Sequence, residues 1–152
     1  MLSGKSEIVA HHQNFIIFMQ RLKTLDEQLL RKPIAEGKWS VIEIVGHFYP
    51  WDEFVLQQRI PYLFTDEHLP KAPSINELNS QSSLLARTEA VEYTLEKCIH
   101  IRQELLSQLM QIPEDDWLIP IQINQSTLTF YEYLKGLMQH DQHHINQIKS
   151  TI

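Results

Sequence analysis

Residues 39–47, Trp-Ser-Val-Ile-Glu-Ile-Val-Gly-His, contain the clearest helix start in the chain. Ser40 and Glu43 form a capping box, in which the serine hydroxyl accepts a hydrogen bond from the backbone amide of Glu43 and the glutamate reaches back to the cap. Apolar residues on both sides of the box are placed to act as a hydrophobic staple. The stretch therefore predicts a helix over residues 40–60.

Pro50 lies inside this predicted helix. Proline removes one hydrogen bond of the helical ladder, and its ring clashes with the carbonyl four residues earlier, which belongs to Gly46. A kink is therefore expected close to His47.

Apolar residues recur at helical spacing in three further segments. These segments predict helices over residues 6–31, 74–111 and 129–148. The second and third of them open with capping boxes of their own, at Ser74 and Thr129. The segment before the last helix, residues 117–123, is rich in β-branched residues and is expected to be extended, as a short ribbon.

Four long helices, with an irregular or short extended connection before the last one, predict an all-α four-helix bundle. The chain has 152 residues and contains no internal repeat or dividing linker. A single domain over residues 1–152 is therefore expected.

Charge and composition restrict the partners and the compartment. The net charge is −6 and no Lys/Arg cluster is available to neutralise phosphates, so nucleic acid is not expected as a partner. The apolar run at residues 15–19 is too short to span a membrane and lacks a cleavage site. Cys98 is the only cysteine, which excludes an internal disulfide. A cytoplasmic location fits these features.

His140 and His144 are four residues apart in the last predicted helix, so their side chains share one face. At about 100° per residue, both lie on one flank of the apolar stripe of that helix, and His47 flanks the core face of its own helix in the same way. His143 points well away and is more consistent with solvent or an interface. Three imidazoles at the edge of a bundle could hold one metal ion and leave a coordination position open.

These histidines also have a simpler interpretation. The i, i+4 pair could be the polar flank of an amphipathic helix, and His47 could be a satisfied boundary histidine. The remaining histidines lack a second ligand at useful spacing and are expected to be structural: His11, His12, His68 and His100.

Three other polar residues near these motifs are open to interpretation. Asp141 falls near the centre of the apolar stripe, where an ionised carboxylate needs a partner. It could accept an imidazole N–H beside the metal. Alternatively, the helix is rotated slightly or Asp141 faces another subunit. Gln147 shares the ligand face and is a candidate contact for a cofactor or bound water. The capping role of Glu43 is a sufficient explanation for that residue.

Both motifs resemble those of one family. Residues 39–47 are similar to the W-S-x-x-E-x-x-x-H signature of the DinB/YfiT-like superfamily, and residues 140–147 are similar to its closing H-x-x-H-H-x-x-Q motif. Helix order, motif positions and length agree over nearly the whole chain. The resemblance implies a four-helix bundle, often dimeric, with a divalent metal held by His47, His140 and His144. Pro50 departs from the pattern and puts the position of His47 in question.

The resemblance also implies a chemistry. Better-known relatives are S-transferases or isomerases that use a low-molecular-weight thiol such as bacillithiol, mycothiol or glutathione. A metal would then bind the thiol as thiolate, which attacks a small electrophilic substrate. Imidazole ligands suit zinc or nickel, with manganese also possible. A small-molecule substrate and a homodimer are expected.

Two alternatives use the same three histidines. A metal-dependent hydrolase would activate water in place of a thiol. A non-catalytic helical dimer, acting as an interaction protein, would carry a structural or vestigial site. Trp51, Phe54 and Tyr133 suggest a pocket with apolar walls, although core packing explains them equally well.

Overall fold

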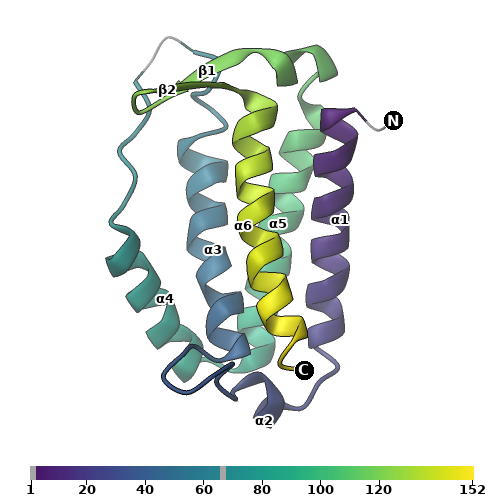
Figure 1. The fold of residues 1–152 in the computed structure, drawn as a ribbon, viewed down its shortest axis with the longest axis vertical. Helices are drawn as coiled ribbons and strands as arrows, with labels where there is room; N and C mark the ends of the chain where they lie inside the picture. The colour runs from purple at the N-terminus through teal and green to yellow at the C-terminus, as the bar shows by residue number, and fades with distance from the viewer. Residues whose placement is uncertain (1–2, 66–67) are drawn as a thin grey trace.

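The computed structural model describes residues 3–65 and 68–152. Within these residues four long helices lie side by side and form the predicted bundle (Figure 1). They are α1 (Gly4–Leu22), α3 (Val41–Gln58), α5 (Val91–Gln111) and α6 (Phe130–Lys149). α1 and α6 run in one direction, and α3 and α5 run in the other (Figure 1).

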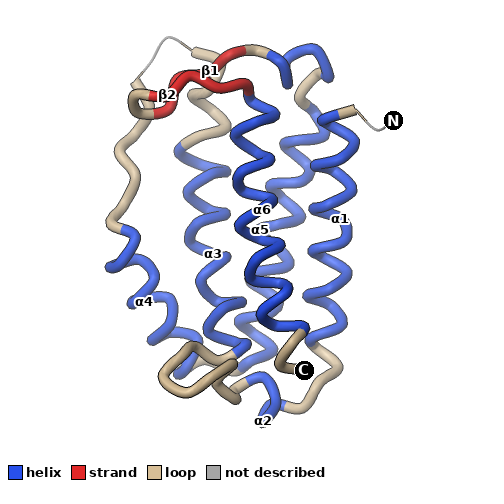
Figure 2. Tube along the Cα trace, in the orientation of Figure 1, coloured by secondary structure: helices blue, strands red, loops and turns tan. Residues whose placement is uncertain are grey.

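The connections lie at the two ends and along one side of the bundle. The single turn α2 (Glu27–Leu30) covers one end, and α4 (Ile75–Thr88) packs outside the bundle against α3. The other end carries the 3₁₀ turn η1 (Glu114–Leu118) and the antiparallel hairpin of β1 (Pro120–Ile123) and β2 (Ser126–Thr129), the strand segments in Figure 2. In the described part of the chain, no helix is long and apolar enough to cross a membrane.

Two of the predicted capping boxes form in full. The Ser40 hydroxyl accepts from the Glu43 amide at 3.3 Å, and the Glu43 carboxylate accepts from the Ser40 amide at 3.2 Å. Thr129 and Glu132 repeat this arrangement at the start of α6. Each cap satisfies amides that the helix leaves unpaired, at about 1 kcal/mol of stability. The starts of both helices that carry the candidate metal ligands are therefore set by local sequence.

The helix predicted over residues 6–31 is confirmed to Leu22 and wrong beyond it. α1 ends at Leu22, the Thr24 hydroxyl bonds the carbonyl of Arg21, and the chain turns before the short α2. Leu25 and Leu30, which follow the turn, still pack in the core. The apolar residues of α1 and of the segment after it therefore have the spacing of one continuous helix.

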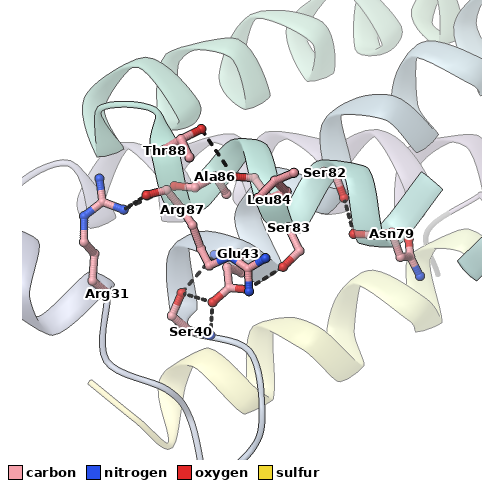
Figure 3. A network of polar contacts seen from close by, with 10 residues as sticks. All are labelled: Arg31, Ser40, Glu43, Asn79, Ser82, Ser83, Leu84, Ala86, Arg87 and Thr88. Carbon is pink, nitrogen blue, oxygen red and sulfur yellow. Dashed lines mark hydrogen bonds and ion pairs between the residues drawn. The ribbon is translucent and has the colours of Figure 1, made fainter. Parts of the chain in front are cut away.

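The predicted helix over residues 74–111 is also wrong, because it divides at Glu89 and Ala90, whose backbones are extended. Arg31 donates to the carbonyls of Ala86, at 3.2 Å, and Glu89, at 2.7 Å, and Figure 3 shows it reaching the end of α4. α4 returns the chain to the α2 end of the bundle, so α5 can run parallel to α3 (Figure 1). The direction that α5 takes in the bundle therefore requires a break in the chain, even though the apolar residues recur at helical spacing across it.

The extended connection is confirmed in its second half. Residues 117–118 belong to η1, and residues 120–123 form β1. Asn124 adopts the left-handed conformation, with φ 56°, in the two-residue turn between the strands. α3 continues through Pro50, and the kink expected near His47 stays a prediction.

Two apolar clusters fill the bundle. One surrounds Phe15, Phe48 and Ile99 toward the α2 end, and the other surrounds Val55, Leu105 and Phe130 toward the hairpin. On each of the four long helices, a polar residue lies in sequence between the two clusters. These residues make a buried polar layer across the bundle, consisting of His11, His12, Asp52, Arg102 and Asp141.

Candidate metal centre

His47 of α3 meets His140 and His144 of α6. One ligand nitrogen from each ring lies within 4.8 Å of the others. The ring centroids are 5.7 Å apart for His47 and His140, and 4.6 Å apart for His47 and His144. His47 is buried, His144 is half-buried and His140 is exposed. The structure thus brings together the three histidines predicted from the sequence, with one side of the group open to solvent.

Hydrogen bonds orient two of the rings. Nδ1 of His47 donates to the carbonyl of Ile44, and Nδ1 of His144 donates to Oε1 of Gln147 at 2.8 Å. With Nδ1 engaged as a donor, the neutral ring keeps its lone pair on Nε2. Such outer hydrogen bonds hold metal-binding histidines in the correct tautomer.

Burial keeps these rings neutral. It is the main cause that lowers the pKa of His47 to about 4, and it also lowers the pKa values of His140 and His144. His47 packs between Trp39 and Phe48, with ring centroids 5.3 and 4.7 Å away. The neutral imidazole is the form that binds a metal, so the group needs no deprotonation at pH 7.

The spacing of two of the three donors already fits a bound transition-metal ion. Nitrogens bound at about 2.0–2.1 Å to tetrahedral zinc lie about 3.4 Å apart. Nε2 of His140 and Nε2 of His144 are separated by 3.2 Å. Three neutral nitrogens leave a fourth position, as catalytic rather than structural zinc sites do.

Gln147 has a contact that the sequence did not predict. We expected it to touch a cofactor or bound water, and the structure shows its side chain bonded to His144. It also lines a cleft of about 300 Å³, together with His144, Trp39 and Lys38. Whether Gln147 also reaches a cofactor stays a prediction.

The other histidines lie outside this group. His143 is exposed, with its ring 5.2 Å from that of His144, and His100 is exposed beside Glu104. His68 lines a separate hollow near Arg59. Cys98 is buried.

The structure gives Asp141 partners that neither interpretation named. Its carboxylate accepts from Nη1 of Arg102 at 2.7 Å and from Nε2 of His11 at 2.8 Å. It does receive an imidazole N–H, but from His11 rather than from a metal ligand, and it is buried within its own chain. Burial opposes its ionisation, yet the Arg102 charge and the His11 hydrogen bond outweigh burial and hold its pKa below the usual range.

Sequence reasoning missed the partners of Asp141. Arg102 is almost fully buried and also donates from Nε to Asp52 at 2.7 Å. The signal was present, because Arg102 and Asp52 occupy positions three or four residues from buried apolar neighbours on both sides. A charged residue within an apolar stripe predicts a buried partner.

Glu43 is explained by packing. Besides the cap, its carboxylate accepts from the Ser83 hydroxyl at 2.5 Å, and it lies 3.8 Å from the guanidinium of Arg87 (Figure 3). It joins α3 to α4, in addition to the capping role predicted from the sequence.

A family comparison agrees with the two motifs and the geometry. The model of the DinB superfamily matches residues 10–148. The chain belongs to the DinB superfamily. In a comparison with curated protein sequences, nothing matched this DinB protein.

Solved structures share the fold of this DinB protein. YfiT from Bacillus subtilis, described as a probable metal-dependent hydrolase with an unusual four-helix bundle topology, is similar with a TM-score of 0.77 and 16% identity, covering 97% of this chain and 85% of YfiT. A mycothiol-dependent maleylpyruvate isomerase is similar with a TM-score of 0.70 and 16% identity, covering 95% of this chain and 62% of the isomerase. At this identity the likeness concerns the fold.

Proposed function

We propose that this DinB protein is a divalent-metal-dependent enzyme that transfers a low-molecular-weight thiol to a small electrophilic substrate. The observation that carries the proposal is the convergence of three neutral imidazoles beside an open cleft. A metal ion bound there would supply a strong positive charge that lowers the pKa of a coordinated thiol or water and so provides a nucleophile at neutral pH.

The roles of the protein groups follow from their positions. His47, His140 and His144 would hold the ion, while the Ile44 carbonyl and Gln147 orient two of the rings. The ion would be zinc or nickel, since imidazole suits these two metals, with manganese as a further possibility.

The cleft beside His144 would hold the thiol. Its volume of about 300 Å³ is at the lower end of the range for small-molecule sites. Ile34 and Trp39 give it apolar walls, and Lys38 gives it a cation for an anionic group of the thiol. Bacillithiol is one thiol of the required kind.

Hydrolysis is the second candidate. The same ion would activate water, and YfiT, which shares the fold, is described as a probable metal-dependent hydrolase. Thiol transfer is preferred because the isomerase with the same fold is described as mycothiol-dependent. A homodimer, a cytoplasmic location and the absence of nucleic-acid partners stay predictions from the sequence.

Metal content is the first test. Protein purified without a histidine tag should contain near-stoichiometric transition metal. His47→Asn retains a donor near the position of Nδ1 but lacks Nε2, and it should lose the metal, as should His144→Ala. His143→Ala, next to a ligand but outside the group, is the matched control. Metal retained by His47→Asn would overturn the site.

Activity then separates the candidates. The loaded protein is offered bacillithiol or glutathione with a panel of small electrophiles, and ester hydrolysis is followed in parallel. Thiol-dependent product formation that His47→Asn abolishes would support the proposal. Hydrolysis without thiol would favour the second candidate, and stoichiometric metal without turnover would favour an interaction protein with a structural site.

A further inference from the structure

Arg59, which directly follows α3, is a buried cation whose contacts are all with neutral groups. The residue is only 5% exposed. Its Nη1 donates to the carbonyl of Pro70 at 2.7 Å, the hydroxyl oxygen of Tyr133 accepts from it as well, and the guanidinium lies 4.6 Å from the centre of the Phe54 ring. No carboxylate of the described residues pairs with it. Because arginine is almost never buried unless it is paired, Arg59 lacks the anion that its burial calls for.

A ligand can reach part of this guanidinium. Arginine carries five N–H groups in a planar fork, and the Pro70 carbonyl and the Tyr133 hydroxyl engage only some of them. Within residues 3–65 and 68–152, Nδ1 of His12 is the only buried side-chain nitrogen or oxygen that has no hydrogen-bond partner. The nitrogens of Arg59 that make no hydrogen bond are therefore accessible to solvent.

Arg59 lines a hollow of about 730 Å³ between the segment that follows α3 and the hairpin. The exposed side chains of Lys71, Gln122 and Asn124 line it too, and they supply an ammonium group and two amides. His68 adds an imidazole. In the described part of the chain no aspartate or glutamate lines this hollow, although the net charge of the protein is −6. The fold thus gathers cations at one place on an acidic protein.

The charges of the hollow favour a dianion. Arg59 and Lys71 are both charged at neutral pH, and neither forms an ion pair with a described residue. A phosphate monoester carries about two negative charges and three strong acceptor oxygens, so it can neutralise both cations, whereas one carboxylate neutralises one. The fork of an arginine also matches phosphate oxygens in a bidentate manner.

The size and the walls of the hollow indicate what the phosphate is attached to. The volume falls within the range of small-molecule sites, about 300–1,000 Å³. It therefore has room for an organic part beside the phosphate. The amides of Gln122 and Asn124 can donate and accept hydrogen bonds, which suits hydroxyl groups better than a hydrocarbon chain.

The hollow is separate from the candidate metal centre. Arg59 follows His47 by twelve residues, which corresponds to about 18 Å along a helix. None of the three candidate metal ligands lines the hollow. A molecule bound there would be distinct from the thiol and from its electrophilic substrate.

We propose that this hollow is a second ligand site, which binds a small polar phosphate monoester. Arg59 and Lys71 bind the phosphate group, and the amides of Gln122 and Asn124 hydrogen-bond hydroxyl groups of the organic part. The inference goes beyond the proposed function, because neither the metal nor the thiol takes part in this binding. Each of the two proposals can therefore fail without the other.

Three matched probes test the site: glycerol 3-phosphate, glycerate and glycerol share a three-carbon skeleton and differ in the anionic group. Each is titrated at pH 7.5 into the ¹⁵N-labelled full chain, and the backbone amide signals of residues 71–72 and 122–124 are followed by NMR. We expect saturable shifts with glycerol 3-phosphate, at least about threefold weaker binding of the singly charged glycerate, and no saturable shift with glycerol. Equal binding of glycerate would overturn the choice of a phosphate. Shifts confined to the residues around His47, or no saturable shift, would overturn the site.

Variants assign the contacts. Arg59→Met retains a long side chain without the charge and should weaken glycerol 3-phosphate binding at least about tenfold, the effect expected for hydrogen bonds to a charged group. Lys71→Met, at an exposed position, should weaken it about two- to fivefold with the fold intact. Arg21→Met changes an exposed arginine of α1 and should bind like the unaltered protein. Unchanged binding by a folded Arg59→Met, or by Lys71→Met, would overturn the assignment.

Asp66 and Glu67 lie outside the described residues, so a further variant tests the effect of their charges. The double variant Asp66→Asn, Glu67→Gln should bind glycerol 3-phosphate about as tightly as the unaltered protein. Binding that appears only in this double variant would mean that carboxylates of the chain itself neutralise the cations, and it would overturn the ligand site.

Discussion

His47 illustrates how a single residue depends on its surroundings. The ring is enclosed by Trp39 and Phe48, and its Nδ1 bonds the carbonyl three residues earlier in the same helix. Desolvation makes protonation costly, and the hydrogen bond leaves Nε2 facing the other two histidines. Burial and orientation together make an ordinary imidazole suited to bind a metal.

Acid should destabilise the metal-free protein through His47. Its pKa is about 4 in the folded chain and about 6.5 in the unfolded chain, so below pH 6.5 the unfolded state binds a proton that the folded state does not bind. Its contribution to stability is complete above pH 6.5 and declines as the pH falls toward 4. The decline amounts to ~3 kcal/mol. Urea denaturation at pH 7.5 and 4.5 measures it.

His47→Asn removes this titration and should show a smaller loss of stability between the two pH values. Part of the loss should persist, since burial lowers the pKa of His12 in the same direction. An equal pH dependence in the variant and the unaltered protein would contradict the assignment to His47.

Gln147 should matter for metal affinity through His144. Gln147→Ala removes the acceptor that holds Nδ1 of that ring, so we expect about 10–100-fold weaker metal binding with the fold intact. A zinc competition titration measures the affinity. Asn146→Ala, a neighbouring exposed position, is the control. Full affinity in Gln147→Ala would show that packing alone orients His144.

At the scale of the elements, α3 owes its position to a close approach as well as to its cap. A Cβ on Gly46 would lie 2.9 Å from the Cβ of Ala86 on α4, whereas a Cβ on Gly136 of α6 would meet nothing within 4 Å. The same residue type therefore has a packing role in one helix and none in the other. Gly46 also precedes His47, so the approach of α4 affects the helix that carries a candidate metal ligand.

The two glycines make a matched pair of variants. Gly46→Ala should destabilise the protein by about 1–3 kcal/mol, because α3 and α4 must separate. Gly136→Ala should stabilise it by up to about 1 kcal/mol, since alanine is the better helix former and has room. Thermal and urea denaturation of both variants measure the difference. Equal changes in the free energy of unfolding would show that α4 can move away from α3 without loss of stability.

At the scale of the whole molecule, the buried polar layer joins the four long helices. Arg102 of α5 links Asp52 of α3 to Asp141 of α6, and His11 adds α1. Because Asp141 follows His140, the same contacts help to set the rotation of α6 about its axis. The layer therefore connects helix packing to the geometry of the candidate metal centre.

Loss of the central cation should be costly. Arg102→Met leaves two buried carboxylates without their shared partner and should destabilise the protein by about 3–5 kcal/mol. Adding Asp52→Leu removes the carboxylate that has Arg102 as its main partner and should recover about 1–3 kcal/mol. Urea denaturation of the single and double variants gives both values. A double variant less stable than Arg102→Met would contradict this account.

Local patterns determined the parts of this protein that depend on neighbouring residues. The capping boxes at Ser40 and Thr129 set helix starts, and the i, i+4 spacing placed His140 and His144 on one face. Helical angles then placed both beside the core, and His47 likewise in its own helix. The bundle and the three candidate ligands could be predicted from the sequence because each signal acts within one or two turns.

Only the tertiary structure decided what depends on residues far apart in the chain. The break at Glu89 follows from the return of α4 along the bundle, and the contacts of Arg102 and Asp141 come from four different helices. Among the described residues, Nδ1 of His12 is buried without a hydrogen-bond partner, and this follows from the helices packed around it rather than from any spacing within α1. The burial of a side chain and its hydrogen-bond partners are properties of the packed molecule, because they depend on which helices become neighbours.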